Sequence, residues 1–235
     1  MALPLYLAMT AAEMSQDKLF EPHLGFMACH FSPCTAGLSN IPQSLPEGAM
    51  LILNDRMPCT DHSPDFVVRQ LADAVSRLGC ESILLDFQRP ADAESRAMVK
   101  SITDALPCPV AVSEGYAKDL ACPVFLAPAP LHVPLGDHLG LWQGREIWLE
   151  AALCQEVIAV TPKGATDTPQ FPPDRLDGGF LDENLCCRYR TEILESEVRF
   201  TLYDTRDSLK KKLEQAEALG VTRAVGLYQE LGSLP

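Results

Sequence analysis

The sequence lacks the short motifs that most often identify a nucleotide-binding or esterase fold. It has no GxGxxG turn, no phosphate loop with a following Lys and Ser or Thr, and no GxSxG elbow. A Rossmann-type or P-loop protein and an esterase of the common hydrolase fold are therefore without support.

Basic residues are also scarce. The chain carries 19 Lys and Arg against 32 Asp and Glu, a formal charge of −13. Such a surface repels phosphate backbones, so nucleic acid is not expected as a partner. The one basic run, Lys210 to Lys212, lies in a helical pattern beside Glu214 and Glu217 and is interpreted as a solvated helix face.

Long hydrophobic runs are missing as well. No stretch reaches the roughly 18 apolar residues needed to span a bilayer, and "MALPLYLAMTAAEM" has no cationic start, so neither a membrane partner nor a secretion signal is expected. The nine cysteines are odd in number, irregularly spaced and without a CxxC pair. These features predict reduced thiols and a cytoplasmic location.

No metal site or cofactor is predicted from the ligand-type residues. "CHFSPC" (29–34) and "CTDH" (59–62), even with His132 and His138 added, match no zinc spacing.

What the sequence does contain is a series of short apolar runs between turn residues. Continuous apolar strands of this kind are typical of a sheet covered on both faces. Three helices alternate with them, over residues 63–79, 91–106 and 205–220; the first has Ser63 as N-cap, Pro64 at its first position and Gly79 at its end. The predicted strands are 4–9, 25–31, 49–55, 82–88, 109–114, 123–130, 146–153, 156–161, 185–193, 197–204 and 223–231.

The order of these elements predicts an α/β fold. Strand and helix alternate over 49–114, which favours a parallel sheet with right-handed crossovers, and eight of the strands can close a TIM-like (β/α)8 barrel. We expect one barrel domain over 1–235, small and irregular, with its outer helices reduced between 115 and 145. Residues 145–203 are predicted to be a hairpin-rich antiparallel insertion, in which "TPKGATDTPQFPPDRLDGG" (161–179) is a loop.

Polar residues stand where several of these strands end. In "GCESILLDFQRP" (79–90), alternation places Leu84, Asp86 and Gln88 on one side of the strand. The carboxyl ends of barrel strands are where barrel proteins build their sites. The alternative interpretation is an ordinary polar strand end.

Two blocks of the chain resemble glycoside hydrolase family 18, the chitinase-like barrels. "SPDFVVRQLADAVSRLGCESILLDFQRP" is similar to the helix and strand that carry that family's DGxDxDxE motif, and "EVRFTLYDTRDSLKKKLEQAEALGVTRAVGLYQELG" is similar to its last units. On this alignment the motif's final Asp-x-Glu falls on Asp86 to Gln88, its inner Asp on Leu84, and its leading Asp-Gly on Glu81 and Ser82. Only Asp86 is kept.

The resemblance implies a barrel whose catalytic motif is degenerate. In the family, the last Glu protonates the glycosidic oxygen while the neighbouring Asp orients the substrate's acetamide. The Gln88 amide has no proton to give, so general acid catalysis is lost at that position. The family's Trp under the sugar is replaced by Gln229, with Tyr228 next to it as a stacking ring under a one-residue shift.

From these patterns we expect a site at the barrel mouth with no cofactor. The candidate catalytic residues are Asp86, Glu114 and Glu230. The candidate ligand-binding residues are Asn54, Asp55, Asp86, Gln88, Glu114, Tyr116, Tyr203, Tyr228 and Gln229.

Three functional hypotheses follow. The first is a carbohydrate-binding barrel without the family's general acid. The second is an active glycoside hydrolase whose acid is Glu114, Glu150 or Glu230. The third is a non-catalytic interaction or scaffold protein that works through the 145–203 hairpins. The sequence leaves the glycan and the oligomeric state open.

Overall fold

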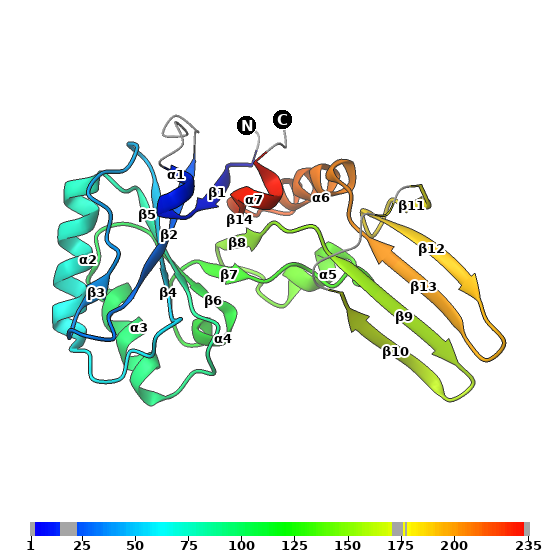
Figure 1. Ribbon diagram of the computed structural model, residues 1–235, viewed down its shortest axis with the longest axis horizontal. Helices are drawn as coiled ribbons and strands as arrows, with labels where there is room; N and C mark the ends of the chain where they lie inside the picture. Colours follow the sequence, from blue (N-terminus) through cyan, green and yellow to red (C-terminus); the bar gives the residue numbers. More distant parts are fainter. Residues whose placement is uncertain (1–2, 15–22, 171–175, 177, 233–235) are drawn as a thin grey trace.

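The centre of the molecule is a closed ring of eight parallel strands. The computed structural model describes residues 3–14, 23–170, 176 and 178–232. The strands follow the order β1-β14-β8-β7-β6-β5-β4-β2, and pairing of β1 with β2 closes the ring (Figure 1). Their bounds are β1 (Leu5–Met9), β2 (Leu24–Phe31), β4 (Met50–Asn54), β5 (Ser82–Asp86), β6 (Val110–Ser113), β7 (Val124–Leu126), β8 (Ile147–Glu150) and β14 (Arg223–Leu227). The predicted eight-stranded parallel barrel is confirmed.

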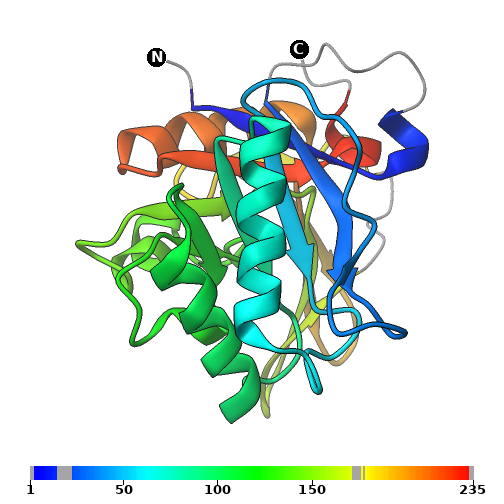
Figure 2. The same ribbon diagram turned by 90° about the vertical axis from the view of Figure 1, so that its left-hand side faces the viewer.

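The outer layer of helices is uneven, as expected for so short a barrel. In the described part of the chain, three helices are long: α2 (Pro64–Leu78), α3 (Ala93–Ala105) and α6 (Arg206–Ala218). Figure 2 shows α2 and α3 side by side over the strands that they connect. The remaining helices are single turns or little more: α1 (Ala11–Met14), α4 (Glu114–Ala117), α5 (Leu135–Gly140) and α7 (Tyr228–Leu231).

Helix α2 shows why this part of the fold could be predicted from the sequence. Val67, Leu71 and Leu78 are buried on one face, which the helical spacing of apolar residues predicts. The helix stops at Gly79, whose φ of 66° is left-handed, and its N–H donates to the carbonyl of Val75. Glycine takes this conformation without the cost that a side chain imposes.

The interior of the barrel is packed with side chains. The inward residues form one apolar cluster: Tyr6, Ala8, Met50, Ile52, Leu84, Ala111, Phe125, Trp148 and Val225. At the amino ends of the strands, the Arg223 guanidinium lies 4.6 Å from the ring centroid of Trp148 and pairs with Glu81 at 3.2 Å. Tyr6 hydrogen-bonds the same Glu81 carboxylate. This end of the barrel is therefore filled by aromatic rings and an ion pair.

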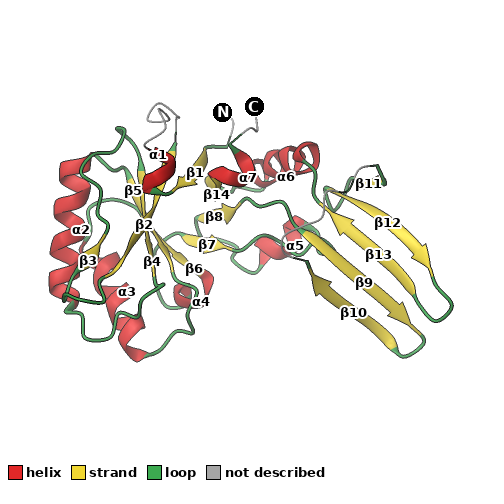
Figure 3. Cartoon of the chain, viewed as in Figure 1, coloured by secondary structure: helices red, strands yellow, loops and turns green. Residues whose placement is uncertain are grey.

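A second, antiparallel sheet extends from the barrel as an arm (Figure 1), and Figure 3 shows that it consists of strands and loops only. Its strand order is β10-β9-β13-β12-β11. The strands are β9 (Gln155–Thr161), β10 (Gly164–Pro169), β11 (Phe180–Asp182), β12 (Cys187–Ile193) and β13 (Val198–Tyr203). The expected antiparallel hairpins in the last third of the chain are confirmed. A short β3 (Leu38–Ser39) adds to β2 on the barrel.

Three details of the sequence prediction need correction. The segment 161–179 is not all loop, because residues 164–169 form β10 and pair with β9. Every residue of β10 is exposed, so no apolar alternation marks it. The segment 223–231 is part strand and part helix, since β14 ends at Leu227 and α7 follows. Residues 127–130 are not a continuation of β7.

Among the described residues, no helix combines the length and the apolar character that a bilayer crossing requires.

Candidate functional site

Three neighbouring strands bring polar side chains to the carboxyl end of the barrel. The strand registers pair His30 of β2 with Asn54 of β4, and Asn54 with Asp86 of β5. Parallel strands in register place residues of the same level on the same face. Ile52 and Leu84 are inside the barrel, so Asn54 and Asp86, two residues further along, also face the inside at its mouth.

The mouth is hollowed above these strands. An open hollow of about 440 Å³ lies there, within the size range of small-ligand sites. It combines hydrogen-bonding groups of both kinds with an aliphatic floor. Its lining residues are Thr10, Met27, Ala28, His30, Asn40, Ile52, Asn54, Asp55, Arg56, Asp86 and Gln88. We call this the mouth hollow.

Asp86 and Gln88 contact each other at its edge. The Gln88 side-chain amide donates to Asp86 Oδ1 at 2.5 Å. Among the described residues, Gln88 is the only side chain that donates to the Asp86 carboxylate. The Gln88 side chain is thus fixed against the Asp86 carboxylate.

The chain around Gln88 is held from two sides. Asp55, which is buried, accepts from the backbone N–H groups of Gln88 and Arg89 at 2.9 and 2.8 Å. Ser113 of β6 accepts from the Phe87 N–H at 3.0 Å and donates to the Leu85 carbonyl at 3.2 Å. These bonds position the end of β5 and with it the two side chains of the site.

Burial affects the charge of Asp86. Removal from water raises the pKa of its carboxyl, and the nearby Asp55 carboxylate raises it further, whereas the hydrogen bond from Gln88 lowers it. The net direction is upward. The Gln88 amide therefore offsets part of the cost of keeping Asp86 ionised.

A second carboxyl faces the mouth from the far side of the ring. Glu150 ends β8 two residues after the inward Trp148, and it is separated from β5 by β6 and β7. Burial, followed by the charges of Asp86 and Glu230, raises its pKa from 4.5 to about 7. The burial of Glu150 and the nearby charge of Asp86 therefore both favour its protonated form.

The structure gathers four of the predicted ligand-binding residues at the mouth hollow: Asn54, Asp55, Asp86 and Gln88. Of these, Asn54 uses its amide to bond the Met27 carbonyl at 3.0 Å and the Arg56 N–H at 3.2 Å. Asp55 accepts hydrogen bonds from the backbone of the loop that follows β5, as described above.

The other predicted site residues lie outside the lining of this hollow. Glu114 is exposed at the start of α4, and Tyr116 is buried with its hydroxyl donating to the Arg89 carbonyl at 3.1 Å. Tyr203 is buried in β13 of the arm and donates to Gly178. Tyr228 and Gln229 begin α7, and Glu230 accepts from the Leu153 N–H.

Sequence reasoning missed His30, Thr10 and Arg56 at the same hollow. His30 is positioned by its neighbours: its Nδ1 lies 2.7 Å from the Phe31 carbonyl and its Nε2 lies 3.2 Å from Asn40 Nδ2. Its place near the end of "GFMACHF" is the same strand-end signal that identified Asn54 and Asp86. If every predicted strand had been searched for polar residues at its end, His30 would have been identified.

One group of metal-ligand side chains occurs in the described part of the chain, and it lies outside the mouth hollow. It consists of His132, Glu156 and Asp167.

No protein-family model matches the sequence, and no curated protein matches it either. Solved structures do match it in fold. The class V chitinase of Nicotiana tobaccum, a mutant form in complex with NAG4, has a TM-score of 0.60 at 12% identity over 96% of this chain and 93% of that chain. A glycoside hydrolase family 18 N-acetylglucosaminidase from Paenibacillus barengoltzii has a TM-score of 0.59 at 12% identity, covering 95% and 94%.

A glycoside hydrolase family 18 chitinase from Cycas revoluta, a mutant form in complex with (GlcNAc)4, has a TM-score of 0.57 at 14% identity, covering 96% and 94%. Each comparison spans nearly the whole of both chains, so the likeness is to the complete barrel and its arm. At these identities the shared property is the fold. The chain therefore has the barrel fold of the family 18 chitinases, as the two sequence blocks suggested.

Proposed function

We propose that this protein uses the mouth hollow to bind a carbohydrate or a glycan-derived ligand without cleaving it. The observation that carries the proposal is the contact between Gln88 and Asp86. Gln88 occupies the position that the resemblance assigns to the general acid, and its amide donates to Asp86 at 2.5 Å. A side-chain amide can bond a sugar oxygen but cannot protonate it.

The chemistry of the mouth hollow supports a polyhydroxylated ligand. Asp86 accepts hydrogen bonds, while Asn54, Gln88 and Thr10 can both donate and accept. Sugar hydroxyl groups need partners of both kinds. Met27 and Ile52 offer aliphatic contact for the faces of the sugar ring. The hollow is open rather than filled by side chains, which favours ligand binding over the scaffold alternative.

The ligand class can be tested with chitotetraose, because the Nicotiana and Cycas structures hold sugars named NAG4 and (GlcNAc)4. We expect saturable binding in titration calorimetry and a loss on the order of 10- to 100-fold in Asp86→Ala, as for a hydrogen bond to a charged group. Asp73→Ala, on the exposed face of α2, is the matched control and should bind normally. Equal affinity of the wild type and Asp86→Ala would remove the mouth hollow from the proposal.

The absence of catalysis is tested by Gln88→Glu. Restoring a proton donor should produce chitooligosaccharide cleavage that the wild type lacks, since a positioned general acid contributes about 10²- to 10⁴-fold. Product analysis by chromatography compares the two forms at equal concentration. Cleavage by the wild type at the rate of the variant would contradict the binding-only function.

A second candidate function is hydrolysis with Glu150 as the acid. The raised pKa of Glu150, near 7, favours it, because a glycosidase acid must still hold its proton at working pH. If the wild type cleaves chitotetraose, Glu150→Gln should abolish cleavage, whereas Gln88→Ala should leave it. Loss in both variants would point instead to a role in binding.

We also propose that the protein functions in the cytoplasm. All nine cysteines are free thiols, and burial raises the pKa of several of them, including Cys29 and Cys80. A reducing compartment is where such thiols persist. Mass determination of the protein from its native source, with and without alkylation, should count nine unmodified cysteines.

A further inference from the structure

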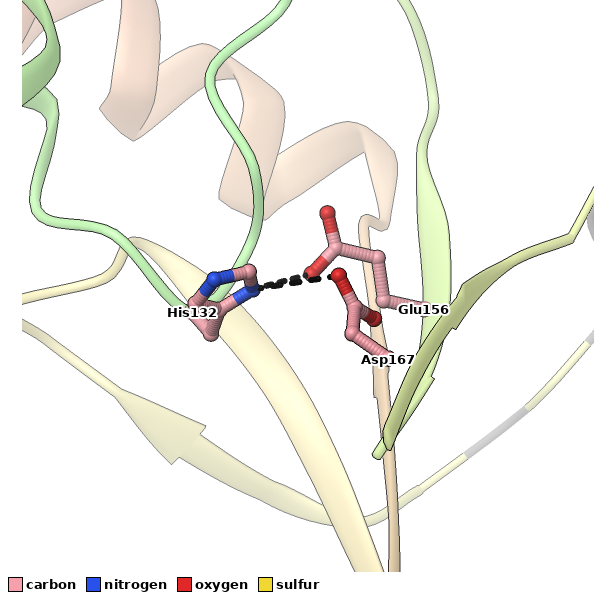
Figure 4. Close-up of side chains that lie close together, drawn as sticks. All are labelled: His132, Glu156 and Asp167. Atoms are coloured by element: carbon pink, nitrogen blue, oxygen red, sulfur yellow. Dashed lines mark hydrogen bonds and ion pairs between the residues drawn. The ribbon is translucent and has the colours of Figure 1, made fainter. Parts of the chain in front are cut away.

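Three metal-ligand side chains converge where the arm joins the barrel. His132 comes from the loop after β7, Glu156 from β9 and Asp167 from β10 (Figure 4). His132 Nδ1 lies 2.9 Å from Glu156 Oε2 and 3.7 Å from Asp167 Oδ2. The three ligand atoms all lie within 4.8 Å of one another.

The strand register explains how the two carboxylates meet. Glu156 of β9 stands opposite Pro169, and Asp167 of β10 stands opposite Ile158. Both carboxylates are therefore on the same face of the arm, one step apart diagonally. The loop that carries His132 lies against this face.

Two contacts hold His132 and Glu156 in place before any ligand arrives. Leu131 is 1% exposed and packs with Cys154, Cys187 and Leu202, which anchors the loop next to His132. The Leu131 N–H donates to Glu156 Oε1 at 2.8 Å, so Oε2 is the oxygen turned to the imidazole. An outer hydrogen bond of this kind orients a carboxylate ligand.

The charge of the cluster is unbalanced. Within the described part of the chain, no lysine or arginine forms an ion pair with Glu156 or Asp167, and the side chain that faces both carboxylates is the His132 imidazole. With a neutral imidazole the cluster carries two negative charges, and the Glu156 side chain is only 8% exposed. A buried carboxylate needs a compensating charge, which a divalent cation supplies.

We propose that His132 Nδ1, Glu156 Oε2 and Asp167 Oδ2 bind a divalent transition-metal ion. Ligands about 2.0–2.2 Å from zinc stand roughly 3.3 Å apart in a tetrahedral site, and the observed separations of 2.9 and 3.7 Å bracket that value. The imidazole disfavours magnesium and calcium, which take oxygen ligands. Three protein ligands leave a position for water.

The ion would tie three separate segments together. It would link the loop after β7 to two strands of the arm, and so fix the arm on the rim of the barrel. This role is independent of the ligand at the mouth hollow.

The test is a zinc titration of the whole chain after treatment with a chelator, followed by calorimetry. We expect one zinc ion per chain that His132→Ala removes, with affinity reduced by at least roughly 100-fold, the upper range for changes in the outer shell of a metal site. His138→Ala is the matched control: His138 lies on α5, outside the cluster, and its loss should leave zinc binding unchanged. Zinc bound by cysteine thiols instead would remain bound in both variants, which would contradict the proposed site.

Asp167→Asn keeps the test decisive if His132→Ala fails to fold, because it changes one oxygen on a partly exposed side chain. It should weaken zinc binding and reduce the zinc-dependent rise in melting temperature, while Asp137→Asn on α5 should do neither. Zinc affinity that is the same in the wild type, His132→Ala and Asp167→Asn would overturn the proposal, as would the absence of binding by the wild type.

Discussion

At the scale of single residues, Glu150 shows how strongly the fold can alter a carboxyl. It is an ordinary glutamate at the end of a short strand, yet burial and two neighbouring carboxylates raise its pKa to about 7. Its charged form is destabilised mainly because burial removes the carboxylate from water, and further because the charges of Asp86 and Glu230 lie nearby. Ionisation of Glu150 as the pH rises therefore costs the folded protein stability.

The raised pKa of Glu150 predicts that the free energy of unfolding falls with rising pH. The folded protein holds the Glu150 proton more tightly than the unfolded chain, so the free energy of unfolding decreases as the pH rises from about 4.5 to about 7. The loss is on the order of 3 kcal/mol at most. Glu150→Gln should remove most of it. Urea denaturation at pH 5 and pH 8 measures the difference.

The control for this prediction is Glu114→Gln, a change at an exposed carboxyl on the same rim. Its pH dependence should match the wild type. A Glu150→Gln protein that loses as much stability as the wild type between pH 5 and pH 8 would contradict the assignment.

At the scale of elements, the base of the arm is joined to α6 by a buried ion pair. Lys212 of α6 lies 2.9 Å from Asp204, which follows β13 and whose side chain is 0% exposed. The Cys154 N–H also donates to this carboxylate, at 3.2 Å. The lysine run was interpreted as a solvated face, but Lys212 falls on the buried side with Leu209 and Ala216, at helical spacing.

We predict that Lys212→Met destabilises the protein by about 3–5 kcal/mol, because it leaves the Asp204 carboxylate buried without its partner. The loss should be smaller at low pH, where a carboxyl whose pKa is already raised by burial takes up a proton. Lys211→Met, one residue away on the exposed side, should change little. Thermal unfolding at pH 5 and pH 8 separates the two variants, and equal melting temperatures would count against the ion pair.

Elements with a regular spacing of apolar residues, or with proline or glycine at their ends, could be predicted from the sequence. The helix 64–78 begins with Pro64, has an apolar face and is followed by Gly79, and the strand 82–86 has a continuous apolar centre over residues 83–85. β10 could not be predicted, since its residues are exposed and only its pairing with β9 makes it a strand.

The side chains of the two candidate sites show the same difference between what could and could not be predicted from the sequence. Asp86 and Gln88 were predicted because alternation within one strand places them together. His132 and Glu156 meet across 24 residues of chain, through a loop and a second sheet that no spacing rule covers. The sequence therefore predicted no metal site. That residues 1–235 form one domain stays a prediction.

At the scale of the whole molecule, the two sheets differ in how much they bury. β4 and β5 are almost wholly buried in the barrel, while β10 is exposed along its whole length and, among the strands that the structure describes, pairs with β9 alone. Local opening is easiest where few apolar contacts must be broken. The barrel should therefore be the most persistent part of the structure.

We predict that backbone amides of β10 exchange with deuterium on the order of 100-fold faster than those of β5. Hydrogen exchange read by mass spectrometry measures both segments in the same sample. Zinc should slow exchange in β9 and β10 if the proposed metal site exists, and should leave β5 unchanged. Equal protection of β5 and β10 would show that the arm and the barrel open together.

The plug of Tyr6, Trp148 and Arg223 at the amino ends of the strands has a consequence for any ligand of the mouth hollow. Because this end of the barrel is closed, a ligand must enter and leave the mouth hollow through the same opening. A long polymer therefore cannot pass through the ring of strands. It can only place one end in the mouth hollow or lie across the rim of the barrel.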